Sequence, residues 1–122
     1  WVKGWGDWNM VLNRQGGPNW ASNWCIAPVI VDPEQDEVYL TPLYYTMSHF
    51  SKYIRPGAEV IGVDNSNKNL QITAAKNPDG TIAVVVFNEG MDRQSFSLHL
   101  NEESKNINIS AQALQTIIIP TN

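Results

Sequence analysis

The sequence predicts an α+β chain that is mainly β and is built from two unlike parts. The first part, residues 1–57, contains the one strong helix pattern, whereas the second part, residues 58–122, alternates apolar and polar residues with period two. Turn-forming Asn, Asp, Gly and Pro residues separate the alternating runs at intervals of about 8–12 residues. Such spacing is typical of an antiparallel β-sandwich.

Composition places the chain among globular proteins. Its 122 residues are 43% hydrophobic and 16% charged, with a formal net charge of −4. The eight basic residues are scattered, which argues against nucleic acid as a partner because phosphate binding requires clustered Lys and Arg. No apolar run approaches the ~18 residues that would predict a membrane span, and the beginning of the chain lacks the pattern of a signal peptide.

The first part reads as a strand, a loop and a hairpin before the helix. The run DWNMVL is compatible with a buried strand that ends near Leu12, and the Gly-, Pro- and Asn-rich stretch 13–23 predicts a loop. A strand is expected over 27–32, followed by an acidic turn at 33–36 and a second hairpin strand over 37–40.

The helix has a clear start and a clear end. Thr41 is placed to cap its N-terminus and Pro42 to occupy its first position, while Pro56-Gly57 ends it. Between these signals, apolar residues recur at spacings of 4, 3 and 4 and predict one apolar stripe: Leu43, Met47, Phe50 and Ile54.

Six strands are expected in the second part. They span Glu59–Asp64, Leu70–Ala75, Thr81–Asn88, Gln94–Leu100, Asn106–Ser110 and Leu114–Pro120. Pro78-Asp79-Gly80 is the sharpest hairpin signal, and NEESK at 101–105 predicts another turn.

Both parts look incomplete by themselves. Sandwiches generally use seven or more strands, and a lone strand followed by one crossover helix has no sheet on which to pack. We therefore expect the chain, which opens on Trp1 without an initiator Met, to be a fragment of a longer protein. Because an unpaired strand and a one-sided helix expose apolar surface, the isolated chain is predicted to self-associate, and a monomeric mass in light scattering would contradict this.

The tryptophans gather at one end of the sequence. All five lie near its beginning: Trp1, Trp5, Trp8, Trp20 and Trp24. Tryptophan is large and is usually either buried or used as a binding platform. Its crowding among Gly, Asn and Asp residues predicts the wall of a site in this stretch.

Several blocks of the sequence together resemble family 30 of the glycoside hydrolases, the glucosylceramidase-type enzymes. They are GWGDWNMVLNRQGGPNW with the following Asn-Trp pair, PVIVD, YYTMSHFSKYIRPG and PDGTIAVVVFN. The resemblance implies a (β/α)8 barrel fused to a β-sandwich, the latter completed by a strand from the N-terminus of such proteins. Residues 1–57 would then be the last barrel strand, its loop and its helix, and residues 58–122 most of the sandwich.

By the same resemblance, the parent protein would be a retaining β-glycosidase that acts on β-glucosides such as glucosylceramide and is secreted, periplasmic or lysosomal. Its partners would be a glycoside or glycolipid substrate and the upstream barrel, without a cofactor or metal. Related enzymes that act on β-1,6-glucan or xylan remain alternatives, as does a non-catalytic carbohydrate-binding or structural sandwich module. The second part contains only Phe87 and Phe96 as aromatic residues, which argues against an exposed stacking platform there.

The resemblance places Trp8 and Asn23 at positions that contact sugar. An indole face can stack on the C–H face of a pyranose, and an amide offers two donors and an acceptor to hydroxyl groups. The alternatives are a core role for Trp8 and a loop-ordering role for Asn23. Asp7 and Trp20 are weaker candidates: Asp7 is expected on the opposite face of the strand as a buried structural hydrogen-bonding group, and Trp20 is expected to pack, like Trp5 and Trp24.

The catalytic carboxylates are expected outside this sequence. Retaining glycosidases use two, about 5–5.5 Å apart, and the resemblance places both glutamates upstream of Trp1. The acidic residues Glu34, Asp36 and Glu37 fall in a predicted hairpin turn and are interpreted as solvated. His49 and His99 have no partner at ligand spacing, so no metal site is predicted. Because both catalytic glutamates are expected upstream, the chain by itself is expected to be inactive.

Overall fold

The structure, a computed structural model, describes residues 4–121. Trp1 lies outside the described residues. The chain divides into two units, Trp1–Ser48 and His49–Asn122, which are treated separately below.

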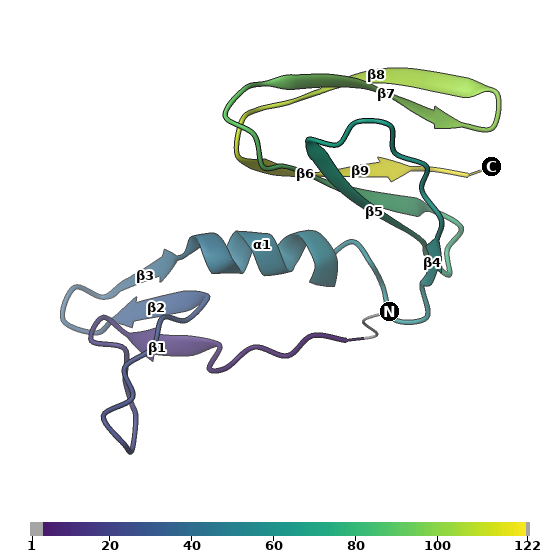
Figure 1. Ribbon diagram of the computed structural model, residues 1–122. Coiled ribbons are helices and arrows are strands. Elements are labelled where there is room, and N and C mark those ends of the chain that lie inside the picture. Colours follow the sequence, from purple (N-terminus) through teal and green to yellow (C-terminus); the bar gives the residue numbers. More distant parts are fainter. Residues whose placement is uncertain (1–3, 122) are drawn as a thin grey trace. The chain divides into compact units, whose positions relative to one another are not determined.

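A three-stranded sheet forms the centre of the first unit. Its strands are β1 (Val11–Asn13), β2 (Val29–Asp32) and β3 (Glu37–Leu40), in the order β1-β2-β3 (Figure 1). The hairpin β2–β3 and its turn are confirmed, with Val31 opposite Val38. The expectation that the first strand has no partner in this chain is wrong, because β1 pairs with β2 in parallel, with Leu12 opposite Ile30.

The first strand is shorter than predicted. Residues 7–10 lie before β1 and are irregular, because the Asp7 carboxylate accepts the backbone N–H of Trp8 at 2.8 Å and Asn9 takes a left-handed φ of 47°. Asp7 is exposed, so its predicted burial on the opposite face of a strand from Trp8 is also wrong. Trp5, Trp20 and Trp24, expected to pack, are likewise exposed in the structure.

The helix begins where the capping signal places it. Helix α1 spans Pro42–Ser51, and the backbone N–H of Tyr44 donates to the Thr41 carbonyl at 3.0 Å. Its regular part ends before Ile54, whose N–H still donates to the Phe50 carbonyl at 2.9 Å. None of its residues is buried among the described residues, and Phe50, in the predicted apolar stripe, is 43% exposed.

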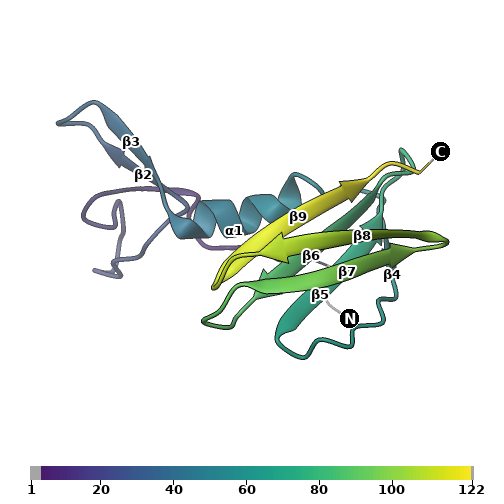
Figure 2. The same cartoon turned by 90° about the horizontal axis from the view of Figure 1, so that it is seen from above.

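The second unit is a two-layered antiparallel β-structure. One layer holds β4 (Glu59–Ile61), β5 (Leu70–Lys76), β6 (Ile82–Asn88) and β9 (Ala113–Ile119), in the order β4-β5-β6-β9, and the other pairs β7 (Gln94–Leu100) with β8 (Glu103–Ile109). Figures 1 and 2 show β7 and β8 lying side by side as a separate layer over the larger sheet. The prediction of an antiparallel β-sandwich region is confirmed.

Two of the six predicted strands differ from the observed bounds by more than one residue, in each case for a local reason. β4 ends at Ile61 because the following residues form side-chain turns, in which the Asn65 amide donates to the Leu70 carbonyl at 2.7 Å. β8 begins earlier than predicted, at Glu103 rather than Asn106, so the turn expected over 101–105 is wrong. The turn is confined to Asn101 and Glu102, and Asn101 at φ 54° lets Glu103 pair with Leu100.

The core of the second unit lies between its two layers. Strand β6 pairs on both sides, with β5 and β9, and its Val86 is fully buried. Ile109 of β8 is 2% exposed and belongs to the same buried cluster, and Phe96 and Leu98 of β7 pack against it. Burial of apolar area at about 25 cal/mol per Å² makes this cluster the main source of the unit's stability.

Two buried asparagines flank the central part of β6. The Asn77 amide donates to the Tyr53 carbonyl at 2.9 Å, and its Oδ1 accepts the Arg55 N–H, also at 2.9 Å. The Asn88 amide donates to the carbonyls of Asp92 and Ser110 at 2.8 and 2.9 Å. Because buried polar groups are costly when unpaired, these contacts fix the segments that they join.

Candidate functional site

The predicted site residues lie in and before the loop that joins β1 to β2. This loop runs from Arg14 to Pro28, long enough for the crossover that a parallel pair requires. It leaves β1 and returns to β2 through a narrow neck, where the Cys25 N–H donates to the Gly16 carbonyl at 3.4 Å and the Asn13 N–H donates to the Gly17 carbonyl at 2.7 Å (Figure 1). The neck defines a protruding tip, residues 18–24.

Two glycines allow the neck to close. Gly16 has a φ of +81°, and a Cβ added there would lie 2.6 Å from the Cys25 carbonyl oxygen. A Cβ on Gly17 would lie 3.3 Å from Cζ3 of the Trp24 ring, so the indole lies directly against this backbone. Gly16 therefore meets both requirements that only glycine satisfies, the left-handed backbone and the close approach.

A single asparagine orders the first arm of the loop. Oδ1 of Asn13 accepts the N–H groups of Gln15 and Gly17 at 3.1 and 2.8 Å, in a turn whose Gly17–Pro18 peptide bond is cis. Its carbonyl also accepts the Gly16 N–H at 2.9 Å. Asn13 thus organises the turn from within, as asparagine commonly does in loops.

The four candidate residues are all exposed, and they come from different segments. Trp8 is 68% exposed and precedes β1, next to Asp7. Trp20, at the tip of the loop, is 94% exposed, and Asn23 lies on its returning arm, shortly before Cys25. In the sequence, Trp8 precedes residues 13–17 of the neck and Asn23 follows them. Both side chains are exposed and are free to contact a ligand.

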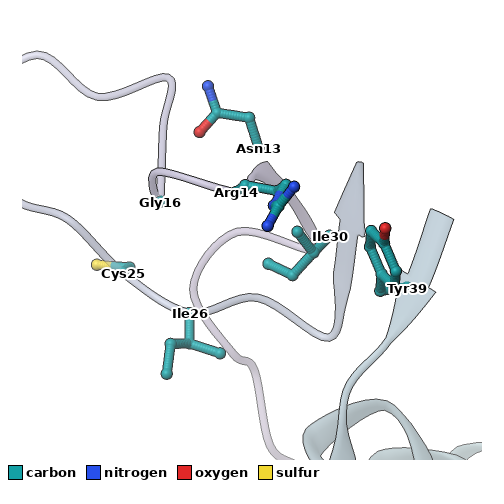
Figure 3. Close-up of a pocket in the computed structure, with 7 residues that line it drawn as sticks. All are labelled: Asn13, Arg14, Gly16, Cys25, Ile26, Ile30 and Tyr39. Atoms are coloured by element: carbon teal, nitrogen blue, oxygen red, sulfur yellow. The ribbon is translucent and has the colours of Figure 1, made fainter. Parts of the chain in front are cut away.

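A shallow pocket of about 430 Å³ lies between the neck of the loop and the β2–β3 hairpin (Figure 3). Its lining residues are Asn13, Arg14, Gly16, Cys25, Ile26, Ile30 and Tyr39. The lining does not include Trp8, Asn23, Asp7 or Trp20, so the predicted sugar-contacting residues and the pocket are different features. The hydroxyl of Tyr39 donates to the Glu37 carboxylate, which raises the pKa of Tyr39.

An ion pair that the sequence interpretation missed supports this pocket. The Arg14 guanidinium lies 2.9 Å from the Asp32 carboxylate, which is almost fully buried at the end of β2. The same carboxylate accepts the N–H groups of Glu34 and Gln35 at 3.1 and 3.3 Å. Burial alone would raise the pKa of Asp32, but the Arg14 hydrogen bond and the two backbone N–H groups outweigh it and lower that pKa below its usual value.

This lowered pKa predicts an acid-dependent stability of the first unit. Because the carboxylate is favoured in the folded state, its stabilisation is complete above the unfolded pKa of about 3.9 and is lost as the pH falls through the folded value. Asp32→Asn should melt at lower temperature than the parent at pH 7, and the difference should shrink below pH 4. Tryptophan fluorescence measures this, with Asp36→Asn in the same turn as control. A difference that is constant from pH 7 to pH 2 would contradict the prediction.

The region around the loop is poor in ionisable side chains. Between residues 4 and 28 the one carboxylate is Asp7 and the one cation is Arg14, and the remaining polar side chains are amides, indole N–H groups, the Ser22 hydroxyl and the Cys25 thiol. Within the described range, no group of three or more His, Cys, Asp and Glu side chains is placed to hold a metal ion. No helix there is long and apolar enough to cross a membrane.

A strand, loop and helix followed by a two-layered β-structure define a piece of a β/α-barrel with an attached β-sandwich. Comparison with known families agrees in both parts. Residues 1–54 match the glycosyl hydrolase family 30 TIM-barrel domain, and residues 57–117 match the glycosyl hydrolase family 30 beta sandwich domain. The chain belongs to glycosyl hydrolase family 30, which confirms the resemblance seen in the sequence.

Individual relatives carry glycosidase names. The chain is 41% identical to lysosomal acid glucosylceramidase of Mus musculus over 75% of its length and 18% of that protein. It is 28% identical to endo-1,6-beta-D-glucanase neg1 of Aspergillus fumigatus over 99% of its length and 26% of that protein. The crystal structure of SrfJ from Salmonella typhimurium is similar with a TM-score of 0.90 and 28% identity, covering 95% of this chain and 26% of that one. The chain thus spans about a quarter or less of the relatives it matches.

Proposed function

We propose that this chain is part of a retaining β-glycosidase that hydrolyses β-glucosides such as glucosylceramide. The observation that carries the proposal is that both parts match domains of the same family, together with 41% identity to a glucosylceramidase. In this proposal the catalytic glutamates lie upstream of Trp1, and the chain supplies a wall of the pocket and the sandwich. We further propose residues 1–57 and 58–122 as its two domains, supported by the change from one family profile to the other between residues 54 and 57.

Trp8 and Asn23 are proposed to contact the sugar that undergoes cleavage. Barrel enzymes place their sites at the C-terminal ends of the strands, and the loop that bears Asn23 follows the C-terminal end of β1. The exposed Trp8 indole provides a flat apolar face, and Asn23 provides an exposed amide. Asp7 and Trp20, also exposed, remain weaker candidates for contacts at the rim.

The proposal is tested with the protein in which this chain is joined to a complete barrel. Trp8→Ala should lower kcat/KM for an aryl β-glucoside roughly ten- to hundredfold, as expected for the loss of a pocket contact of about 1–3 kcal/mol. Met91→Ala replaces a similarly exposed apolar residue of the sandwich and should leave kcat/KM unchanged. Equal activity of the Trp8 variant and the parent would reject the proposed contact.

The 122-residue chain alone should not turn over the same substrate. Two carboxylates at the reacting bond are indispensable to the retaining mechanism, and the sequence between residues 4 and 28 has a single acidic side chain, Asp7. Turnover by the purified chain above a mock preparation would refute this. Self-association of the isolated chain, supported by exposed Met10 and Ile26, is tested by light scattering.

Endo-β-1,6-glucan hydrolysis is the second candidate activity. It is favoured by similarity over 99% of the chain to a protein named as an endo-1,6-glucanase. Parallel assays with glucosylceramide and with β-1,6-glucan separate the two substrates. The lysosomal name of the mouse relative supports a proposed location outside the cytoplasm, in a secretory or lysosomal compartment.

A further inference from the structure

The outward face of the β7–β8 pair has an unusual composition. Inward-pointing residues such as Phe96 and Leu98 pack on the core, which leaves every second residue of β7, and its partners in β8, facing away from it. The outward residues are Ser95, Ser97 and His99 of β7 and Ser104, Asn106 and Asn108 of β8. All six are exposed, and all are polar and formally uncharged at pH 7 in a chain whose net charge is −4. We call these six residues the polar ladder; the strands that carry it are seen in Figure 2.

Hydrogen bonds across the two strands fix the orientation of the ladder's side chains. The Ser95 hydroxyl donates to Oδ1 of Asn108 and the Ser97 hydroxyl donates to Oδ1 of Asn106, each at 2.6 Å. In each pair the hydroxyl proton and the amide oxygen satisfy one another, so the amide NH₂ group and the serine oxygen lone pairs remain for an external ligand. Successive pairs repeat at roughly 6.7 Å along the strands.

We propose that the polar ladder binds a neutral polyhydroxyl ligand, a glycan chain lying along β7 and β8. Sugar hydroxyls both donate and accept, which matches the alternating amide donors and serine acceptors. The face offers no cation to a phosphate and no apolar area to a lipid, so charge and polarity both favour a neutral carbohydrate. Side chains that are already held by their neighbours lose little freedom on binding.

This proposal goes beyond the proposed function, because it concerns binding and not hydrolysis. The ladder contains no Trp, Tyr or Phe side chain on which a sugar could stack, so binding rests on hydrogen bonds and is expected to be weak, with a Kd on the order of 1 mM. The ladder would hold a polysaccharide near the protein, whereas Trp8 and Asn23 would hold the sugar that is cleaved. The proposed function therefore enters only through the choice of a β-glucan as probe.

The test is affinity electrophoresis of the 122-residue chain through gels that contain soluble β-1,6-glucan. The chain is produced in bacteria, because Asn108-Ile109-Ser110 is an acceptor sequence for N-glycosylation in eukaryotic secretion. The parent should be retarded, and Asn106→Ala/Asn108→Ala should lose at least fivefold in affinity. Ser97→Lys should also abolish retardation, because it covers the face with a long charged side chain. Gln71→Ala changes an exposed amide of the other sheet and should behave as the parent.

Two further comparisons make the outcome decisive. Met10→Ala, which changes an exposed apolar residue of the first unit that is not a proposed sugar contact, should retain full retardation, and far-UV circular dichroism confirms that each variant is folded. Absence of retardation of the parent, or unchanged retardation of both folded ladder variants, would overturn the ladder proposal. Neither result depends on turnover, so an active parent enzyme without retardation would reject the ladder and leave the proposed hydrolysis intact.

Discussion

Replacing Ile109 with alanine is expected to lower the free energy of unfolding of the second unit by about 2–5 kcal/mol. Ile109 is 2% exposed and lies in the cluster that joins β8 to the larger sheet, with Val86 and Leu70. Truncation removes buried methylene and methyl groups and leaves a cavity between two layers that cannot fully collapse onto it. Since small β-structures are only marginally stable, a loss of this size would approach the total stability of the unit.

The measurement is urea unfolding followed by far-UV circular dichroism. Tryptophan fluorescence would report only on the first unit, because all five tryptophans precede Cys25. Ile118→Ala is the matched control, since Ile118 is 42% exposed on β9 and should lose less than about 1 kcal/mol. Equal losses for Ile109→Ala and Ile118→Ala would show that Ile109 does not belong to a packed core.

The second large effect is expected at Gly16, in the neck of the loop. Alanine in a left-handed backbone costs roughly 1–2 kcal/mol, and its Cβ would also approach the Cys25 carbonyl oxygen to 2.6 Å. Backbone cannot yield as a flexible side chain does, so the two arms of the neck must separate. We expect the Asn13 amide, bonded to the Gly17 carbonyl at 2.7 Å, to exchange with solvent at least about tenfold faster.

Hydrogen exchange of the Asn13 amide, measured by NMR, tests this directly. Gly62→Ala is the matched control, because its added Cβ meets no atom within 4 Å, and it should leave the exchange unchanged. In the protein with a complete barrel, Gly16→Ala should also lower kcat/KM, since Asn23 lies on the displaced arm. Unaltered protection of the Asn13 amide would contradict the proposed closure of the neck by Gly16.

The parts of the fold that follow from sequence are those with strong local signals. Thr41-Pro42 determines the helix start because Pro42 presets the φ of the first helical position and the Thr41 carbonyl accepts the Tyr44 N–H within the first turn. The Thr41 hydroxyl does not cap the helix but donates to the carbonyls of Ala27 and Pro28. Pro78-Asp79-Gly80 determines the β5–β6 hairpin, where Gly80 takes the φ of 89° that glycine allows and the Asn77 N–H bonds the Thr81 carbonyl at 2.8 Å. In both cases the deciding interactions connect residues close in sequence.

The features that sequence reasoning missed depend on distant or non-periodic contacts. The parallel pairing of β1 with β2 is set by the long loop between them, whose closure requires the contact of Gly16 with Cys25. The periodicity of apolar residues does not predict such a contact. Likewise, the Arg14–Asp32 pair joins residues 18 positions apart. The one hint of it in the sequence is an Asp at the end of the apolar run VIVD, where a buried carboxylate would need a partner.

The candidate site was predicted by resemblance and only partly by physical chemistry. Clustering of tryptophan indicates a binding wall, but it does not select Trp8 over Trp20 or Trp24. The structure shows that Trp24 lies against Gly17, whereas Trp20 is almost fully exposed. The ligand contacts of Trp8 and Asn23 stay predictions, since the sugar would be held between them and the proposed upstream part of the barrel.

Strand β6 has a consequence for the biosynthesis of the protein. Its run IAVVVF is apolar, β-prone and uncharged, the composition of segments that form intermolecular β-structure when exposed. β6 ends at Asn88, but β9, one of its two neighbouring strands, begins only at Ala113. In a nascent chain, one edge of β6 therefore stays unpaired until the intervening segment and β9 have been synthesised. At about 5–20 residues per second this lasts roughly a few seconds, a window in which a chaperone that binds short hydrophobic segments would raise the yield of native protein.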